Sequence, residues 1–446
     1  MAHFALLAPE AGGHIYPIGS LAAELRRRGH QTTLVALAAA APLAEKLDLT
    51  LRELRESAKP PRPSRAAAIA SRPLGLNWAA NLRARFLWKS ELILDQAPAI
   101  IRDLQADAVI VDQTILAGGS VAESLSLPFA TVCSALMWNE EPQVPPHFTG
   151  WGYSGGNWAR YRNRIGYAAW EAYMRTTVRS INRYRGRWGL PTLRRSTQTI
   201  SPYLQLSQLC PEFDFPRREL ASTCHYVGPL AMARPPRQDD FPWDRLDGRP
   251  LIFASLGTVP SVSNFPVYQK IAKACSGLDA QLVLSLGKWG NKAGDARARL
   301  GRLAGDPIVV DFAPQLALLQ KASLLITHAG QNTTLEALHF GVPMVALPRS
   351  ADQPAMAARL EHAGVALRGS FWKSTPEGLR KLVNRVLTEP HFRQRADELR
   401  QALSQTGGAA HAADLIEAML RTGKPITNAR TTNNDRSPRN DLHIPS

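Results

Sequence analysis

The sequence predicts an α/β fold in which two Rossmann-like domains face each other across a cleft. Short apolar segments alternate with helical patterns in both halves of the 446-residue chain, and a proline-rich stretch at 232–244 separates the halves. Strands that are apolar at consecutive positions are typical of a parallel sheet covered by helices on both faces. Because ligands bind beyond the carboxyl ends of such strands, two facing sheets would hold two ligands in one cleft.

The first half opens with a strand–helix–strand unit. An apolar segment at 3–8 precedes a glycine-rich turn at 9–17, residues 18–28 have the apolar spacing of a helix, and 31–37 form the next apolar segment. This spacing predicts a right-handed crossover between two parallel strands. Strand, helix and strand follow again within 108–135, so the first half has the alternation of a doubly wound domain.

Two stretches of the first half break this alternation. Residues 59–90 contain Pro, Arg and Trp and are expected to form a lid or insertion. Residues 151–195 hold four Trp, five Tyr and ten Arg, with Glu171 as the only acid. We expect a helical insertion there. It either forms an apolar ligand pocket and docks on an anionic bilayer, or is a solvated basic helix pair with its aromatic side chains in the core.

The second half repeats the pattern, and it predicts a second parallel sheet. Strands are expected at 250–258, 280–287, 307–314, 324–330 and 341–348, and helices near 266–277, from Asn332 onward and from Thr375 to Arg421. The predicted organisation is an N-terminal domain at 1–230, a linker at 231–247, a C-terminal domain at 248–423 and a disordered tail at 424–446. The last helix is expected to cross back to the N-terminal domain.

Composition narrows the class of protein. The formal net charge of +16 favours an anionic partner, such as nucleotide phosphates or an anionic membrane surface. No nucleic-acid partner is expected, because no recognition motif accompanies the charge. The four cysteines are widely spread without a CxxC pair, which indicates neither a zinc site nor a disulfide framework and fits reduced thiols in the cytoplasm.

No segment of the sequence has the pattern of a signal peptide or a membrane span. The chain opens directly into an apolar strand. No uncharged apolar run reaches the roughly 18 residues that a span requires. Any membrane contact is therefore expected to be peripheral, at the inner face of a membrane.

Residues 312–353 carry the strongest functional signal. A strand is expected to end at Thr327 and a helix to begin near Asn332. Gly330, between them, lets the backbone approach a ligand closely, and the unpaired amides and dipole of a helix start attract anions. His328, Asn332 and Thr333 add side-chain donors at the same place, so we expect a diphosphate to bind there without a metal ion.

Three further polar residues in this stretch suit the hydroxyl groups of a sugar. Glu336 lies one turn into the expected helix, where its carboxylate can accept hydrogen bonds from the vicinal hydroxyls of a ribose. Asp352 and Gln353 follow the next strand, in a loop at the same edge of the sheet. A carboxylate and an amide together offer acceptors and donors in fixed positions.

This stretch resembles the nucleotide-sugar signature of family 1 glycosyltransferases, the UDP-glycosyltransferase group, whose members have the two-domain GT-B fold. The matching positions are Phe312, Pro314, Gln315, His328, Gly330, Asn332, Thr333, Glu336, Gly341, Val342, Pro343, Asp352 and Gln353. Phe312 stands where plant-type members usually have a Trp that stacks on uracil. GGHIYP near the start of the chain and SLGT at 255–258 also match, and Thr258 is expected to reach the phosphates or the sugar.

The resemblance also implies a catalytic base. The family places a histidine in the first strand-to-helix loop, here His14, and an aspartate at the end of a later strand, here Asp112, which orients the imidazole. From the residues alone, His14 could instead cap its loop or contact phosphate, and Asp112 could cap a helix or bind a loop amide. The implied reaction is a single in-line displacement with inversion, in which the UDP-sugar is a co-substrate and neither cofactor nor metal takes part.

The acceptor is suggested by a closer similarity within the family. Residues 111–136 and 139–153 resemble the bacterial zeaxanthin glucosyltransferases. This implies transfer of a hexose, glucose by the Asp352–Gln353 ending, from a UDP-sugar to a hydroxylated carotenoid or another hydrophobic small molecule. Macrolide, sterol and polyphenol acceptors and a lipid-linked cell-wall intermediate are alternatives. A non-catalytic accessory protein of the same fold is another, although such proteins often lose the base or the donor residues that this chain retains.

Overall fold

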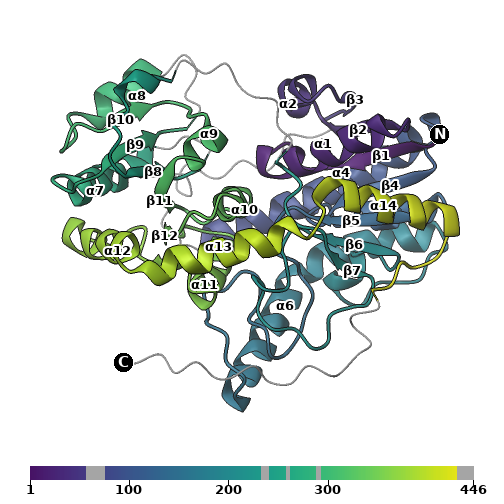
Figure 1. The fold of residues 1–446 in the computed structure, drawn as a ribbon. Helices are drawn as coiled ribbons and strands as arrows, with labels where there is room; N and C mark the ends of the chain where they lie inside the picture. The colour runs from purple at the N-terminus through teal and green to yellow at the C-terminus, as the bar shows by residue number, and fades with distance from the viewer. Residues whose placement is uncertain (57–75, 233–240, 258–261, 288–292, 429–446) are drawn as a thin grey trace.

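The computed structural model describes residues 1–56, 76–232, 241–257, 262–287 and 293–428. Its helices and strands form two parallel sheets with helices packed around each (Figure 1). The fold class predicted from the sequence, two parallel-sheet α/β halves, is therefore confirmed. Among the described residues, no helix is both long and apolar enough to cross a membrane.

The N-terminal sheet has seven strands in the order β3-β2-β1-β4-β5-β6-β7, all parallel. The strands are β1 (His3–Leu7), β2 (Gln31–Leu37), β3 (Thr50–Leu54), β4 (Ala108–Asp112), β5 (Phe129–Cys133), β6 (Leu204–Ser207) and β7 (Cys224–Tyr226). The central strands β1, β4 and β5 are buried along almost their whole length. The helices of this half are α1 (Gly12–Arg27), α2 (Ala41–Lys46), α4 (Leu76–Asp103), α5 (Gly118–Ser124) and α6 (Asn157–Arg187).

The C-terminal sheet has six strands in the order β10-β9-β8-β11-β12-β13. The strands are β8 (Leu251–Ser255), β9 (Gln281–Ser285), β10 (Ile308–Val310), β11 (Ala322–Thr327), β12 (Met344–Ala346) and β13 (Ala366–Arg368). The helices around this sheet are α7 (Phe265–Cys275), α8 (Ala293–Leu300), α9 (Gln315–Leu319), α10 (Gln331–His339), α11 (Gln353–His362) and α12 (Pro376–Thr388).

Four short strands, β3, β6, β7 and β13, were missing from the sequence prediction. Each has three to five residues, too few for a period of two to be distinguished from a loop. β3 and β13 also carry exposed polar positions because they lie at sheet edges. Their apolar content is therefore lower than that of the central strands.

Helix α1 begins earlier than the sequence predicted, at Gly12 instead of Ile18. The prediction treated 9–17 as a glycine-rich turn, and this stretch ends at Pro17. Proline lacks the N–H that would bond four residues back, but this costs one helical hydrogen bond only, that to the carbonyl of Gly13. His14 therefore lies in the first turn of a helix and not in a loop.

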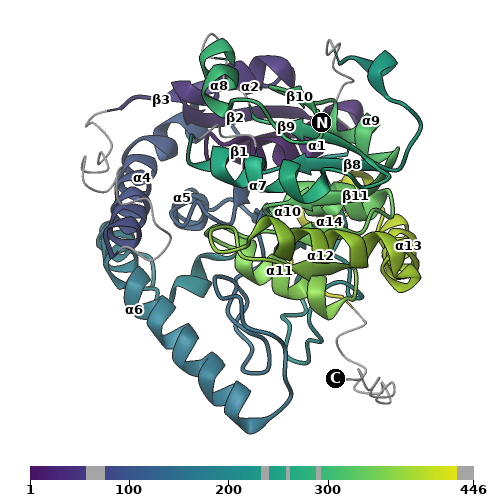
Figure 2. The ribbon, with the colours of Figure 1, turned by 90° about the vertical axis from the view of Figure 1, so that its left-hand side faces the viewer.

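Two long helices fill the stretches that interrupted the alternation. Residues 59–75 of the predicted lid lie outside the described residues, whereas its remainder forms the first part of α4. Helix α6 occupies most of 151–195 and packs along α4, as Figure 2 shows. The predicted insertion is thus one long helix rather than a helix pair.

The last two helices return the chain to the N-terminal half. Helix α13 (Pro390–Ser404) runs from the C-terminal half toward α14 (Gly408–Thr422), which packs against α1 (Figure 1). Arg28 contacts the carboxylates of Asp414 and Glu417 at 2.6 and 3.0 Å. Of the predicted tail, the amide of Ile426 donates to the carbonyl of Tyr203 at 2.9 Å, and 429–446 lie outside the described residues.

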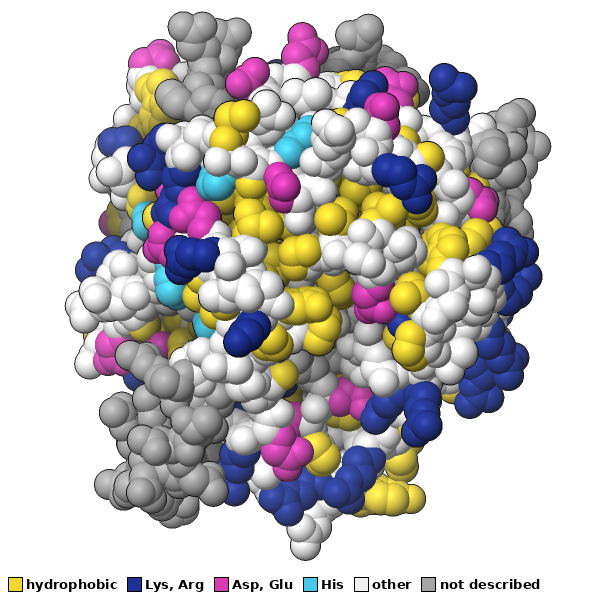
Figure 3. All heavy atoms as spheres, turned by 90° about the vertical axis from the view of Figure 1, so that its right-hand side faces the viewer, with side chains coloured by type: hydrophobic (Ala, Val, Ile, Leu, Met, Phe, Trp, Pro, Cys, Tyr) yellow, Lys and Arg dark blue, Asp and Glu magenta, His cyan; other side chains and the backbone are white. Residues whose placement is uncertain are grey.

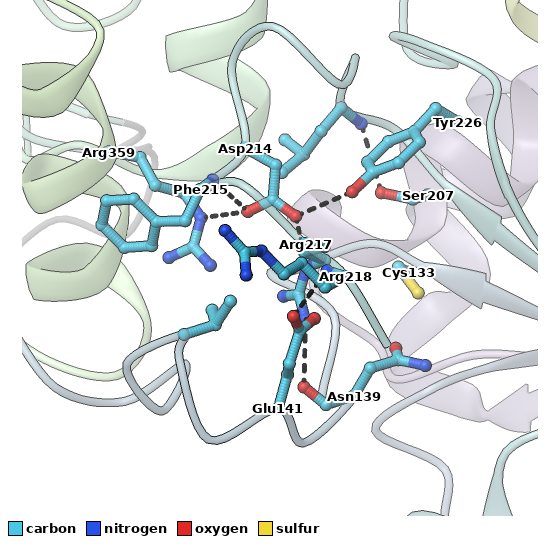
Figure 4. Close-up of polar contacts among 12 residues, drawn as sticks. Cys133, Asn139, Glu141, Ser207, Asp214, Phe215, Arg217, Arg218, Tyr226 and Arg359 are labelled. Carbon is cyan, nitrogen blue, oxygen red and sulfur yellow. Dashed lines mark hydrogen bonds and ion pairs between the residues drawn. The ribbon is translucent and has the colours of Figure 1, made fainter. Parts of the chain in front are cut away.

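A buried ion cluster joins the two halves on the side of α11 (Figure 4). Asp214, in the loop between β6 and β7, accepts from Nε of Arg359 on α11 at 2.7 Å and from Nε of Arg217 at 2.6 Å. The hydroxyl of Tyr226 and the amide of Phe215 also donate to this carboxylate. Burial raises the pKa of Asp214, but the two guanidinium groups outweigh it and hold that pKa well below its usual value.

Candidate active site

A cavity of about 710 Å³ lies between the two sheets, at the carboxyl ends of their strands. Its N-terminal wall includes the segment Glu10–His14 at the start of α1 and the segment after β5. Its C-terminal wall comes from the ends of β8, β9 and β11, from α9 and from the start of α10. The predicted site residues that line it are His14, Phe312, Gln315, His328, Gly330, Asn332, Thr333, Glu336 and Asp352.

His14 and Asp112 meet because β1 and β4 are neighbours in the sheet. Leu7 lies opposite Val111 in this pairing, so the residues that follow the two strands converge. Nδ1 of His14 lies 2.9 Å from Oδ2 of Asp112, and the carboxylate is fully buried whereas the imidazole is 23% exposed. Oδ1 of Asp112 accepts from the amide and the hydroxyl of Thr114 at 2.9 and 2.5 Å. Asp112 thus binds a loop amide and holds the imidazole at once.

The electrostatic surroundings of His14 favour a proton on the imidazole. Burial lowers the pKa of His14, but the charge and hydrogen bond of Asp112, with the charge of Asp352, outweigh this and raise it above 6.5. Burial raises the pKa of Asp112, yet His14, Thr114 and Ser134 together lower it below its usual value. Asp112 is therefore ionised near neutral pH, and with Nδ1 engaged, Nε2 of His14 is the nitrogen left to exchange a proton in the cavity.

Asn332 connects the start of α10 to the start of α1. Its Nδ2 donates to the carbonyl of Gly13 at 3.1 Å. This carbonyl would accept from residue 17 inside α1, but Pro17 has no N–H. The proline thus leaves the carbonyl oxygen of Gly13 without its helical donor at the cavity wall, and the side-chain amide of Asn332 donates to this oxygen.

The turn into α10 brings His328 against two glycines. Ala329 has a left-handed φ of 62° and Gly330 is the N-cap residue of α10. A Cβ atom on Gly330 would lie 2.5 Å from Nε2 of His328, and one on Gly257 would lie 3.2 Å from it. Burial lowers the pKa of His328 to about 4. The charge of Arg349 acts in the same direction, whereas the backbone of Ser255 raises the pKa. The imidazole is therefore neutral near pH 7, and its ring carries a single N–H.

Glu336 and Gln315 form one polar unit on the C-terminal wall. Nε2 of Gln315, at the start of α9, donates to a carboxylate oxygen of Glu336 and lies 3.3 Å from Oγ1 of Thr333. The Glu336 carboxylate is almost fully buried yet reaches the cavity. Phe312 lines the same wall. An aromatic ring, an amide and a carboxylate in this order can hold a base and a ribose.

Asp352 and Gln353 are adjacent in the sequence, but their side chains lie in different surroundings. Asp352 lines the cavity, and burial raises its pKa although the backbone amide of Leu136 lowers it. Gln353 does not line the cavity; its Oε1 accepts from the amides of Arg349 and Ser350 at 2.9 and 3.1 Å. The structure thus places one of the pair in the cavity and uses the other to shape the loop before α11. Thr258 lies outside the described residues.

Several residues of the site were not singled out from the sequence. Glu10 lines the cavity and pairs with Nζ of Lys89 on α4 at 2.5 Å. Gln331 lines it too, and its Nε2 donates to the carbonyl of Cys133 across the domain interface at 3.0 Å. Glu10 lies within the glycine-rich segment at 9–17 that was recognised, so its position was a usable signal. Lys89 has no such signal, because only the packing of α4 brings it near.

A metal site is not assembled by the described residues. They contain no group of three or more His, Cys, Asp and Glu side chains that could hold an ion. A diphosphate in the cavity would meet the backbone amides at the start of α10 and the side chains beside them, and Lys46 also lines this cavity.

Comparisons with known proteins agree with this geometry. Residues 195–403 match the family described as UDP-glucoronosyl and UDP-glucosyl transferase. The zeaxanthin glucosyltransferase of Pantoea ananas is 35% identical over 96% of this chain and 98% of its own length, and that of Pseudescherichia vulneris is 34% identical over 96% and 100%. Among solved structures, the glycotransferase of kitacinnamycin superposes with a TM-score of 0.74 at 24% identity, covering 94% of this chain and 98% of that one.

Proposed function

The chain belongs to the UDP-glucuronosyl and UDP-glucosyl transferase family and is a glycosyltransferase, and from this premise we propose that it moves glucose from UDP-glucose to a hydroxyl group of a hydroxylated carotenoid. The observation that carries the proposal is a single cavity that has His14, hydrogen-bonded to the buried Asp112, on one wall and the start of helix α10 on the other. One wall suits an acceptor hydroxyl that must lose a proton, and the other suits a departing diphosphate.

The donor half of the proposal assigns each side chain a partner on UDP-glucose. The start of α10, with His328, Asn332 and Thr333, binds the diphosphate. Glu336 accepts from the ribose hydroxyls with Gln315 beside it, and Phe312 contacts the uracil. Asp352 accepts from hydroxyls of the glucose, and its position within the cavity supports this role.

The reaction in this proposal is one in-line displacement. The acceptor oxygen forms a bond to the anomeric carbon while the bond from that carbon to the diphosphate oxygen breaks, and the electron pair leaves with UDP. The hydroxyl proton passes to Nε2 of His14, whose imidazolium is stabilised by Asp112. Donors already in place around the leaving diphosphate supply the electrostatic stabilisation, so we expect no metal ion or cofactor to take part.

The carotenoid acceptor is supported by the relatives and by the side chains near the cavity. Both zeaxanthin glucosyltransferases match the N-terminal half as well as the C-terminal half. Just after Ser134 and Ala135 in the cavity wall, the ring of Trp138 stacks on His147 at 5.3 Å, with Trp170 edge-on to both. Burial lowers the pKa of His147 to about 3, so this aromatic cluster carries no charge at neutral pH. Neutral aromatic surroundings suit a polyene better than a polar acceptor.

A carotenoid resides in a bilayer, and we accordingly propose that the protein works in the cytoplasm with peripheral contact to the inner face of a membrane. The excess of basic residues is compatible with such a surface.

The test is a transfer assay with purified protein. UDP-glucose and UDP-N-acetylglucosamine are each offered with zeaxanthin dispersed in detergent, and in parallel with a macrolide, a sterol and a polyphenol, in buffer with and without EDTA. Mass spectrometry should detect zeaxanthin mono- and diglucoside with UDP-glucose, and NMR should show the β-anomer that inversion of an α-linked donor produces. Transfer to the other acceptors alone, or with the N-acetylated donor alone, would overturn the proposal. Loss of transfer in EDTA would overturn its metal-independent step.

A further inference from the structure

One face of α6 is exposed along the whole helix. Large apolar side chains lie on this face in the first half of the helix, and arginines lie on it in the second half. In the first half this face carries Trp158, Tyr161 and Ile165, which are 73%, 57% and 53% exposed. These positions are spaced by three and four residues, so they form one stripe on the helix. Among the described residues, six large apolar side chains are exposed, and three of them belong to this stripe. Single exposed apolar residues are ordinary, but a contiguous stripe marks a contact surface.

The same face becomes basic in the second half of the helix. Arg175 and Arg179 are exposed one turn apart and continue the stripe. Arg164, beside Ile165, is exposed as well. In Figure 3, Lys and Arg side chains gather along the edge of the molecule where α6 lies, with apolar side chains at its lower end. A partner of this face must accept both aromatic and cationic side chains.

The single acid of α6 does not weaken this charge. Glu171 is turned toward the fold, where its carboxylate accepts from the amide and the hydroxyl of Ser196, both at 2.9 Å. The charged side chains at the exposed positions of α6 are therefore all positive.

The other face of α6 anchors the helix to the region of the cavity. Trp170 and Tyr173 stack on each other at 5.6 Å, and Trp170 contacts Trp138, close in sequence to the cavity wall. Figure 2 shows the first half of α6 extending beyond the body of the protein while the second half packs along α4. One helix thus connects an exposed apolar end to the aromatic cluster that we assign to the acceptor.

We propose that the exposed face of α6 docks on an anionic lipid bilayer, with Trp158, Tyr161 and Ile165 inserted at the interface and Arg175 and Arg179 on lipid phosphates. Trp and Tyr prefer the headgroup level of a bilayer, and basic residues beside an apolar helix face are attracted to anionic lipid. The inference rests on the proposed function for the choice of a bilayer as partner, because a bilayer is where a carotenoid would be met.

The test measures binding without donor or acceptor, so its outcome is separate from that of the transfer assay. Full-length protein is floated with vesicles of phosphatidylcholine, with and without phosphatidylglycerol, at low and high salt. Wild type should float with the phosphatidylglycerol vesicles and be released by salt. Replacing the three apolar residues together by Ala should lower partitioning by about tenfold or more, and R175Q with R179Q by about tenfold.

Matched controls use exposed residues away from α6. Trp243→Ala removes a Trp that is 39% exposed, and R393Q with R400Q removes the same charge from α13; both should bind as wild type does, and thermal melting should be unchanged in all variants. The proposal is overturned if wild type does not bind vesicles, if the α6 variants bind as well as wild type, or if the controls lose binding equally. A dimer that the Ala variant abolishes, without vesicle binding, would identify the stripe as a contact between copies instead.

Discussion

Nδ1 of His14 lies 2.9 Å from Oδ2 of Asp112, and the other oxygen of that carboxylate accepts twice from Thr114. The aspartate is therefore held by its own loop before it holds the imidazole. This arrangement fixes the ring orientation and directs Nε2 toward the cavity. It also makes the charge state of His14 depend on a residue that need not contact the substrates.

The acidic limb of the pH–rate profile should follow the ionisation of His14 and should shift when Asp112 is replaced. Burial lowers the pKa of His14, but Asp112 and Asp352 raise it above 6.5, and the base works only when neutral. kcat/KM should therefore fall as the pH decreases through this raised value. In Asp112→Asn the burial effect remains while the largest raising effect is lost, so the limb should move to lower pH. The plateau should drop by about 10²–10⁴-fold because the ring is less well oriented. An unmoved limb in the variant would contradict the assignment.

His14→Ala should separate catalysis from donor binding. The imidazole lies on the N-terminal wall, across from the residues assigned to UDP, so its loss should lower kcat by about 10²–10⁴-fold and leave the calorimetric Kd for UDP nearly unchanged. His391→Ala, which removes an exposed histidine at the start of α13, is the control and should keep wild-type turnover. Wild-type kcat in the His14 variant would show that another group takes the proton.

Glu336→Ala should weaken UDP binding. The variant removes a buried carboxylate that reaches the cavity from α10 and leaves Nε2 of Gln315 without one of its acceptors. Loss of charge-assisted hydrogen bonds of this kind costs about 1.5–3 kcal/mol each, equivalent to about a tenfold to hundredfold rise in Kd for UDP. Glu361→Ala, at the far end of α11 with its carboxylate 2.9 Å from Arg368, should leave Kd unchanged. Equal Kd values for the two variants would place the ribose elsewhere.

The donor side was the part of the site most accessible from the sequence, because its residues lie within one stretch. His328, Gly330, Asn332 and Glu336 are brought together by a single strand–turn–helix unit, so local spacing was enough to predict their common position. Gln353, by contrast, is not among the residues that line the cavity. Adjacent residues at a helix start can point to different surroundings, and only the structure shows that its side chain caps the loop at Arg349.

Contacts between distant segments were not accessible in this way. The Asn332–Gly13 bond depends on a carbonyl that Pro17 leaves unpaired inside α1, and the sequence prediction had assigned this proline to a turn. Asp214 and Arg359 are 145 residues apart, and each is an ordinary charged residue in its local sequence. Both side chains are buried because the two domains pack together, and no sequence period or motif predicts that packing.

The Asp214–Arg359 pair should be a large contributor to stability at neutral pH. Both side chains are almost fully buried, at 0% and 1% exposure. Removing one partner leaves an uncompensated buried charge, and Asp214→Asn should therefore lower the free energy of unfolding by about 3–5 kcal/mol. Asp397→Asn, whose carboxylate is 38% exposed beside Arg393 and Arg400, is the control and should cost less than about 1 kcal/mol.

The difference between wild type and Asp214→Asn should also depend on pH. The pKa of Asp214 is lowered in the folded protein, so the contribution of the carboxylate is complete above its unfolded pKa of about 3.9. It is lost as the pH falls from there toward the lower folded value. Urea unfolding at pH 7 and at successively lower pH measures this difference. A difference that stayed constant into the acid range, or one no larger than that of the Asp397 control at pH 7, would show that the cluster does not hold the two halves together.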